Sequence, residues 1–543
     1  TLYRSYQEWY ENFDGMSAVE VAYSVSLPEF DGIIHSCPVT TMERDAEGKQ
    51  VTQTIAERMN MLVRKAKKLA LLRIKPNAEK KIAIVFHNHP STNSNIGSCS
   101  AIDSIESVRL LLQDLRDAGY VIDHIPADRQ EFINELIAGA TNDRDYMSEK
   151  QIDNADAKLL VSAYRDYYRT LPEKVQQRLE QDWGEAPGDV FVYDDFLLIP
   201  GMMNGNIFIT MQPPRGFVED PDKIYHSPDC APTHHYLGFY HWLRDIWGAD
   251  AMMHIGTHGS LEWLPGVAMG DECYPDICTG DLPNVYPYWV VDTGEGIQAK
   301  RRSAACLISY ISAPLSISGV YDELAELEKA LEEYVHFKAD KDADLSEPMA
   351  QIREKAAAAD FTDEVREEDA ADFDDYVGHL HTYLTDLKNM QMTTGLHIMG
   401  NPPQGEKLTE YLYALVRLEN PDMPSLPKTL AQAYGYDYYE LIDNSSKLLP
   451  DGILSYGMLL DKINGQCLEI IRLLQNDGFV VHEDKLRALE CVKCWDEAVQ
   501  QKMIKIAGFI CDKLYPSLAH TTWERSNCIR ALQSEYIEPS AGG

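Results

Sequence analysis

The sequence predicts a multidomain α/β protein in which parallel α/β sheets are followed by a mainly helical C-terminal region. A chain of 543 residues is too long for one compact core, so two to four domains are expected. Short apolar runs alternate with helical patterns from about residue 80, which is typical of a parallel sheet, and helical periodicity dominates beyond about residue 320. We therefore predict a partial N-terminal segment over 1–79, an α/β region over 80–320 and a mainly helical region over 321–543.

The elements follow one another in the order that this fold class requires. The pattern TIAERMNMLVRKAKKLALLRIK (54–75) predicts a long helix ahead of the sheet, and KKIAIVFHNHP (80–90) predicts a strand closed by proline. The amphipathic stretch 104–120 predicts a helix that ends near Gly119, and VIDHIP (121–126) predicts a second strand. Three further apolar runs, each broken by glycine or proline, repeat the strand pattern: DVFVYDDFLLIPG (189–201), GNIFITMQPPRG (205–216) and ADAMMHIGTHG (249–259).

The composition indicates which partners to expect. Forty-nine basic and 86 acidic residues give a formal net charge of −37, which argues against nucleic acid or an anionic membrane as a partner. An anionic small molecule needs only one local basic pocket. No run approaches the ~18–20 apolar residues that span a bilayer, and the first residues do not have the pattern of a signal peptide. Eleven irregularly spaced cysteines are typical of reduced thiols, so we expect a cytoplasmic protein.

The stretch MHIGTHGSLEWLPG (253–266) carries the most chemistry. It places His254 and His258 four residues apart and Glu262 four residues further on. The glycines favour a bent loop after a strand, in which two imidazoles and a carboxylate can converge on a metal. The spacing alone also fits two histidines that are hydrogen bonded to loop backbone, and a zincin would need HExxH on a helix. Both interpretations remain open at this point.

Polar side chains gather at the ends of the neighbouring elements. In parallel sheets, ligands bind beyond the carboxyl ends of the strands, so several such clusters within ninety residues predict a binding site there. The candidate ligand-binding residues are Gln212 and Arg215 in QPPRG, His234 and His235 at the start of a helix, and Glu295, Gln298, Lys300 and Arg302 in GEGIQAKRR.

Four longer stretches together resemble one protein family. They are GNIFITMQPPRGF, PTHHYLGFYHWLRDIWGADAMMHIGTHGSLEWLPG, DLPNVYPYWVVDTGEGIQAKRR and TTGLHIMGNPPQGE. In this order they resemble the large subunit of CobN-type cobaltochelatases, in the family that also contains the magnesium chelatase H subunit. The resemblance extends over nearly the whole chain, and it implies that family members continue beyond both of its ends.

The resemblance implies ATP-dependent insertion of a divalent metal into a tetrapyrrole. The metal substrate would be cobalt, with magnesium or nickel as alternatives, and the pathway would be cobalamin biosynthesis. ATP would be used by separate AAA+ ATPase and adaptor subunits, and this chain has no G-x-x-x-x-G-K-[ST] loop. Glu262 would accept protons or guide the cation, and His254, His258 and Glu262 would be transient metal ligands. Arg215, Lys300 and Arg302 would pair with the carboxylates of the macrocycle.

Three other functions stay open. A metallohydrolase would hold a fixed zinc ion with His254, His258 and Glu262. A non-catalytic paralogue would bind the tetrapyrrole without inserting a metal. A magnesium chelatase H-type subunit would carry out the same reaction with a different metal.

Overall fold

The computed structural model describes most of the chain, and its contacts divide the chain into two compact units. The described residues are 1–11, 16–99, 101–144, 147–216, 229–256, 261–266, 273–289, 293–312, parts of 326–380, 396–444, 447, 449–450 and 456–538. Unit 1 comprises 1–312, 397–402 and 520–543, and unit 2 comprises 313–396 and 403–519. The two units are defined by contacts between residues, whereas the three predicted ranges were defined by sequence patterns. The three ranges remain a prediction about domain organisation.

A six-stranded sheet forms the centre of unit 1. Its strands lie in the order β11 (Ala305–Tyr310), β10 (Asn284–Trp289), β9 (Ala251–Ile255), β3 (Ile82–Phe86), β8 (Ile207–Met211) and β7 (Met202–Asn204). All neighbours are parallel except β7 and β8. The residues of β3, β8 and β9 are buried throughout, as expected for a parallel sheet that is covered on both faces. The predicted parallel α/β fold is confirmed.

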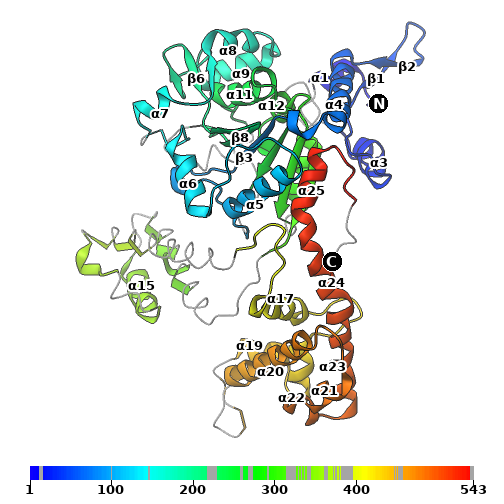
Figure 1. The fold of residues 1–543 in the computed structure, drawn as a ribbon, viewed down its shortest axis with the longest axis vertical. Helices are drawn as coiled ribbons and strands as arrows, with labels where there is room; N and C mark the ends of the chain where they lie inside the picture. Colours follow the sequence, from blue (N-terminus) through cyan, green and yellow to red (C-terminus); the bar gives the residue numbers. More distant parts are fainter. Residues whose placement is uncertain are drawn as a thin grey trace. The chain divides into compact units, whose positions relative to one another are not determined.

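Helices cover both faces of this sheet, so unit 1 has three layers (Figure 1). One face packs against α5 (Ser104–Asp117), α6 (Arg129–Ala138) and α25 (Trp523–Leu532). The other face packs against α8 (Val161–Tyr168), α9 (Glu173–Trp183), α11 (His234–His241) and α12 (Tyr274–Thr279). Because both faces are covered, the carboxyl ends of the parallel strands are the natural place for a site.

The two longest predicted helices of unit 1 are confirmed. Helix α4 (Ala56–Ile74) occupies the first predicted helical pattern. Helix α5 begins where the Asp103 side chain accepts a hydrogen bond from the backbone of Glu106, which caps the first turn. Gly119 has a φ of 89° directly after this helix, a conformation that glycine adopts without strain.

Two predicted strands differ in the structure. Residues 121–126 form no strand, because the Asn204 side chain accepts hydrogen bonds from the backbone of Asp123 and His124 and donates one to the His124 carbonyl. Residues 189–201 do not join the parallel sheet. They form a hairpin of β5 (Val192–Tyr193) and β6 (Phe196–Leu198), which belongs to an antiparallel sheet with β4 (Lys158–Leu160). Asp194, with a φ of 49°, makes the two-residue turn that this hairpin requires.

The remaining elements of unit 1 are short. They are α1 (Tyr6–Glu11), α2 (Ala18–Val21), the π-helix η1 (Ala22–Ser26), α3 (Leu27–Phe30), the hairpin β1 (Thr40–Arg44) and β2 (Gln50–Thr54), η2 (Asn77–Glu79), η3 (Asn93–Asn95), α7 (Glu149–Asp153), the π-helix η4 (Trp242–Ile246), η5 (Leu261–Trp263), α13 (Thr293–Ser303) and η8 (His520–Thr522). Residues Leu261–Trp263 form a single 3-10 turn.

The Glu524 carboxylate connects the three segments of the chain that make up unit 1. The chain leaves unit 1 after residue 312, returns for 397–402 and returns again at residue 520. The Glu524 carboxylate accepts hydrogen bonds from the backbone N–H of Ile311 at 3.1 Å, from the N–H of Gly400 at 2.6 Å and from His397 Nε2 at 2.6 Å. These buried contacts give residues 397–400 of the motif GLHIMG a structural role within unit 1.

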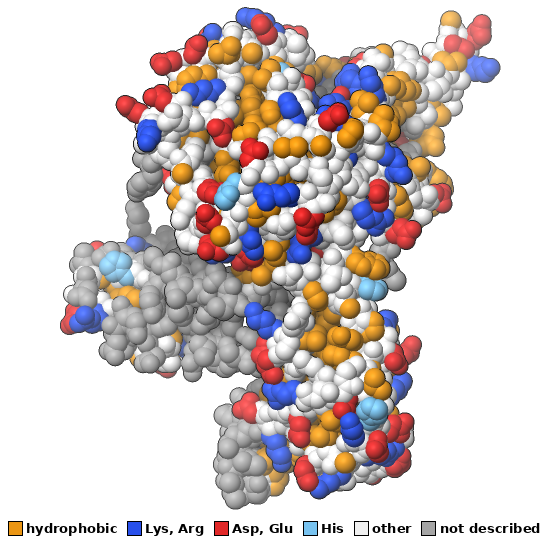
Figure 2. Space-filling view, viewed as in Figure 1, with side chains coloured by type: hydrophobic (Ala, Val, Ile, Leu, Met, Phe, Trp, Pro, Cys, Tyr) orange, Lys and Arg blue, Asp and Glu red, His pale blue; other side chains and the backbone are white. Residues whose placement is uncertain are grey.

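Unit 2 is helical in the part that the structure describes. Its helices are α15 (Ser346–Ala358), η6 (Glu367–Asp369), α17 (Glu406–Arg417), α18 (Leu426–Ala433), α19 (Tyr438–Asp443), α20 (Tyr456–Asn476), α21 (Glu483–Ala488), α22 (Glu490–Lys493), α23 (Glu497–Phe509), the π-helix η7 (Ile510–Leu514) and α24 (Tyr515–Ala519). The predicted helical C-terminal region is confirmed. None of the helices in the described part of the chain is long and apolar enough to cross a bilayer. Figure 2 shows acidic and basic side chains interspersed over the face in view.

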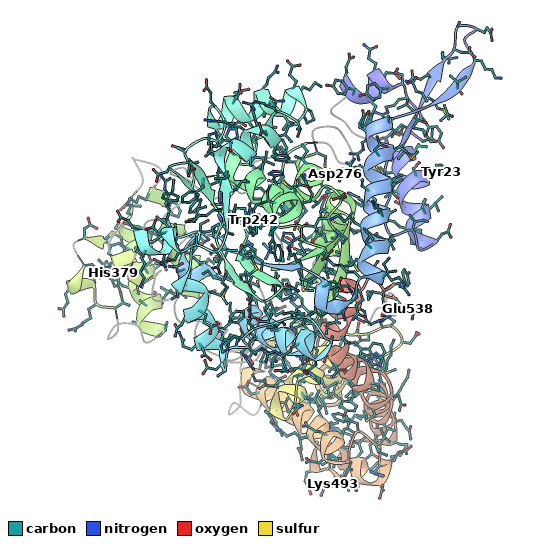
Figure 3. The ribbon with its side chains drawn as sticks, turned by 45° about the horizontal axis from the view of Figure 1, so that its top comes forward. Tyr23, Trp242, Asp276, His379, Lys493 and Glu538 are labelled. Carbon is teal, nitrogen blue, oxygen red and sulfur yellow. The ribbon has the colours of Figure 1, made fainter. Side chains whose placement is uncertain are left out.

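A buried ion cluster attaches α4 to α12. Arg58 and Lys65 lie two turns apart on α4, and both reach the Asp276 carboxylate at 3.1 Å. Figure 3 shows Asp276 beside this long helix. Burial by itself would raise the pKa of Asp276, but Lys65 and Arg58 outweigh it and hold the pKa below its usual value.

We predict that Asp276→Asn strongly destabilises unit 1. The variant leaves two buried cations without their anion, which costs about 3–5 kcal/mol of unfolding free energy. Urea denaturation at neutral pH measures this loss. Asp281→Asn is the control, because Asp281 lies 3.9 Å from an Arg64 side chain that is 60% exposed, a pair worth at most about 1 kcal/mol. Since the pKa of Asp276 is lowered on folding, its contribution is present at neutral pH and disappears as the pH falls through the folded-state pKa. Equal stability of the two variants at neutral pH would contradict the prediction.

Candidate functional site

Polar side chains meet at the carboxyl ends of β3, β8 and β9, beside the first half of β10. His87 and Gln212 directly follow β3 and β8, His254 is the fourth residue of β9, and Tyr286 lies in β10. Together with Val85, Ile255 and Gly256, these residues line one narrow pocket. The predicted residues Gln212 and His254 are therefore brought together at the edge where parallel sheets bind their ligands.

A chain of hydrogen bonds determines the tautomer of His254. Ser303 Oγ donates to the Ala299 carbonyl and accepts from Asn284 Nδ2, so Asn284 Oδ1 is free to accept from His254 Nδ1 at 2.9 Å. His254 Nε2 therefore lacks a proton and accepts from the Tyr240 hydroxyl at 3.0 Å. The Tyr240 oxygen in turn accepts from Gln212 Nε2 at 3.2 Å.

These bonds occupy both nitrogen atoms of His254. Burial lowers the pKa of this imidazole to about 4, so the ring is neutral at physiological pH. A metal could bind to Nε2 only if the hydrogen bond from Tyr240 were broken. Of the two interpretations that the sequence left open, the structure thus supports a hydrogen-bonded histidine for His254, whose partners are side chains rather than loop backbone. His258 lies outside the described residues.

Glu262 is the buried carboxylate of the site. It belongs to the 3-10 turn η5, is 3% exposed, and accepts a hydrogen bond from the Tyr286 hydroxyl at 3.3 Å. Its charge also contributes, after burial, to the raised pKa of Tyr240. Glu262 therefore lies close to the His254 network. It offers what a proton acceptor needs, a carboxylate at the strand ends.

Two predicted substrate-binding arginines contact the loop that carries Glu262. Arg302 donates to the Glu262 carbonyl at 2.8 Å through Nη1, and to the Gly266 and Pro265 carbonyls at 2.6 Å and 3.4 Å through Nη2. Arg215, which is 2% exposed, donates to the Trp263 carbonyl at 3.5 Å and to the Cys230 carbonyl at 3.2 Å. In the structure, these guanidinium groups bind loop backbone.

His234 and His235 bind to other parts of unit 1. His234 Nε2 donates to the Gly184 carbonyl at 2.9 Å, so its Nδ1 accepts from the Tyr164 hydroxyl at 2.8 Å. His235 Nε2 donates to the Leu198 carbonyl at 2.7 Å, and burial lowers its pKa to about 4. The residue of α11 that is hydrogen bonded to His254 is Tyr240.

The remaining predicted residues lie on α13. Lys300 is 3.6 Å from Glu29 of α3, and the neighbouring Arg301 binds the same carboxylate at 2.9 Å. Gln298 is exposed, and Glu295 is half-buried in the first turn of the helix. Arg302, near the end of the same helix, is hydrogen bonded to the loop around Glu262.

Sequence reasoning did not identify three residues of this site. Tyr240 and Asn284 hold the ring of His254, and Tyr286 binds Glu262. The signal available in the sequence was a polar residue, Asn284, at the start of the apolar run NVYPYW. A buried amide at such a position requires a partner inside the protein.

Two other features of unit 1 lie outside this site. A cavity of about 450 Å³ is lined by residues of α4, α8 and α12 and by none of the predicted site residues. In the described part of the chain, one group of three possible metal ligands has its ligand atoms within 4.8 Å of one another: His124, Glu131 and Glu135. All three are at least partly exposed, and His124 already binds Glu135 at 3.0 Å.

We predict that Tyr240→Phe destabilises unit 1, because it leaves His254 Nε2 and Gln212 Nε2 without this hydroxyl. Buried polar groups that lose a partner cost about 1–3 kcal/mol of unfolding free energy. Urea denaturation measures the loss against Tyr23→Phe, which removes a hydroxyl from a ring that is 63% exposed. If both variants are equally stable, the His254 network contributes nothing to folding.

Comparisons with known proteins identify the family. The family model described as CobN/Magnesium Chelatase matches residues 1–543. An uncharacterised protein of Methanocaldococcus jannaschii is 38% identical over 549 residues, which cover 99% of this chain and 43% of that protein. The aerobic cobaltochelatase subunit CobN of Pseudomonas aeruginosa is 35% identical over 448 residues, which cover 79% of this chain and 35% of that subunit.

A solved structure has the same fold. The catalytic subunit of cobaltochelatase from Mycobacterium tuberculosis matches with a TM-score of 0.71 and 30% identity, over 99% of this chain and 44% of that chain. The present chain thus spans less than half the length of each of these three proteins. Because the family model covers every residue and the fold agrees over nearly the whole chain, this chain belongs to the CobN/magnesium chelatase family.

Proposed function

We propose that this chain is the metal-insertion part of the large subunit of an ATP-dependent chelatase, acting in the cytoplasm in cobalamin biosynthesis. The large subunit binds a tetrapyrrole and inserts a divalent metal, while separate AAA+ ATPase and adaptor subunits hydrolyse ATP. The observation that carries this proposal is a buried carboxylate, Glu262, at the strand ends of a chain that belongs to the chelatase family.

Metal insertion requires a proton acceptor. The free macrocycle carries two pyrrolic N–H protons, and both must leave as the cation enters the ring. In this proposal, the Glu262 carboxylate accepts one of these protons from a pyrrolic nitrogen, the other proton passes to solvent water, and the carboxylate guides the cation towards the ring. The hydrogen bond from Tyr286 orients Oε1, and burial excludes the water that would screen the charge.

The same proposal gives His254 a supporting role in place of metal binding. Its neutral ring accepts from Tyr240 and donates to Asn284, so it holds β9, β10 and α11 together behind Glu262. Of the predicted transient ligands, this leaves Glu262 and His258, and His258 lies outside the described residues. The predicted ligand-binding roles of Gln212, His234, His235, Glu295, Gln298 and Lys300 remain part of the proposal and call for direct measurement of tetrapyrrole affinity.

Cobalt is the metal we favour. Two of the three similar proteins described above are named as cobaltochelatase subunits, at 35% and 30% identity. Magnesium remains the alternative, because the matching family model includes magnesium chelatase. A carboxylate such as Glu262 suits magnesium at least as well as cobalt, so the donor type does not decide between the two metals.

Reconstitution tests the function. The full-length protein is mixed with its AAA+ ATPase and adaptor subunits, ATP and a tetrapyrrole, and insertion of cobalt, magnesium or nickel is followed by absorbance. We expect ATP-dependent insertion that is fastest with cobalt. Faster insertion of magnesium would identify the magnesium chelatase H-type function. Tetrapyrrole binding without any insertion would identify a non-catalytic paralogue.

We predict that Glu262→Gln abolishes most metal insertion and leaves tetrapyrrole affinity nearly unchanged. The amide keeps the size of the side chain and an acceptor oxygen for Tyr286, but it cannot take up a proton at neutral pH. Loss of general-base catalysis reduces a rate by about 100- to 10,000-fold. The control is Glu79→Gln, a substitution at an exposed glutamate far along the chain from the site. Insertion by Glu262→Gln at the normal rate would make Glu262 a structural residue.

A further inference from the structure

Backbone hydrogen bonds hold the loop around Glu262 in part. Within Leu261–Gly266, the Leu264 N–H donates to the Leu261 carbonyl at 3.3 Å, and the Pro265 carbonyl accepts from the Tyr274 N–H at 3.3 Å. Both distances are at the long end of the range for such bonds. Bonds of this length are weak, so contacts from other elements help the loop to hold one conformation.

Two arginines supply these contacts from other elements. Arg302, near the end of α13, donates to the carbonyls of Glu262, Pro265 and Gly266. Arg215, after β8, donates to the carbonyl of Trp263. Four of the six loop carbonyls therefore accept from a guanidinium group. Hydrogen bonds from a charged donor are about twice as strong as neutral ones.

The chemistry of these contacts differs from that of substrate capture. In the described part of the chain, Arg302 forms no ion pair with a carboxylate, and its Nη atoms are directed to carbonyl oxygens instead. A planar guanidinium with several donors can bridge carbonyls that lie on successive residues, whereas an ammonium group is a point charge and cannot span them. The geometry is that of a support for the loop backbone.

We propose that Arg302 is a positioning residue for Glu262, with Arg215 supporting the same loop from β8. This inference rests on the proposed function, in which Glu262 accepts the proton. Arg302 acts through the backbone of Glu262 and does not bind the carboxylates of the tetrapyrrole. Replacing Arg302 changes the position of the Glu262 carboxylate and leaves binding of the macrocycle intact.

The test compares Arg302→Met with Arg301→Met in the full-length protein. Arg301 is the neighbouring arginine on the same helix, and its guanidinium group binds the Glu29 carboxylate instead. Misplacement of a reacting group by about 1 Å costs on the order of 100-fold in rate, so Arg302→Met should lose about this factor in kcat for metal insertion. Its Kd for the tetrapyrrole should match that of Arg301→Met. Arg302→Lys should lose a similar factor, because it keeps the charge and loses the fork.

A double-mutant cycle tests the connection between the two residues. If Arg302 acts only through Glu262, adding Arg302→Met to Glu262→Gln should cause no further loss of kcat. If the two substitutions reduce kcat by independent factors that multiply in the double variant, the inference is overturned. A weaker Kd in Arg302→Met, with recovery in Arg302→Lys, would overturn it as well, because that pattern indicates a charge that binds substrate.

Amide hydrogen exchange separates this inference from the proposed function. The N–H groups of residues 261–264 should exchange faster in Arg302→Met than in Arg301→Met, whether or not the wild-type protein inserts metal. If the wild type inserts none, the proposed function fails while faster exchange still supports Arg302 as the support of the loop. If the wild type inserts metal and these N–H groups exchange equally fast in both variants, only the positioning role of Arg302 is overturned.

Discussion

Burial at the carboxyl ends of β3, β8 and β9 and at the first half of β10 imposes one requirement on unit 1, because every polar group there needs a partner inside the protein. The requirement explains the directed chain of hydrogen bonds from Gln212 through Tyr240, His254 and Asn284 to Ser303. Each donor in this chain has an acceptor, so a buried imidazole can stay neutral in one tautomer. The network also ties two strands to α11, which makes the strand ends a rigid base for the Glu262 loop.

Local patterns in the sequence were sufficient to predict the core of the fold. The apolar runs became β3, β8 and β9, because a strand that is buried on both faces is apolar throughout. The helical patterns became α4 and α5, because their spacing places apolar residues on one face of a helix. The same reasoning failed at residues 121–126. There the Asn204 side chain, some eighty positions along the chain, binds the backbone that a neighbouring strand would have used. The periodicity of residues 121–126 contains no information about a side chain from so distant a position in the sequence.

The candidate site was predicted in its location but not in its contacts. The strand-end rule indicated the carboxyl edge, and Gln212, His254, Glu262, Arg215 and Arg302 do lie in one connected set of contacts there. The residue types suggested that the imidazoles bind metal and that the arginines bind carboxylates. In the structure, His254 binds Tyr240 and Asn284, and both arginines bind loop carbonyls. Residue type indicates what a side chain can bind, whereas burial decides what it must bind.

The hydrogen bonds of His254 and Glu262 also bear on how a chelatase releases its metal. A site with two imidazoles and a carboxylate would hold cobalt tightly, because neutral nitrogen donors suit this cation. The hydrogen bond from Tyr240 occupies Nε2 of His254, so coordination there would have to compete with a buried hydrogen bond. Among the predicted metal ligands that the structure describes, Glu262 then remains as the oxygen donor. A single carboxylate holds a hydrated cation weakly. In the proposed function, weak holding is an advantage, because the four nitrogens of the macrocycle can take over the cation without a tight protein site to compete with them.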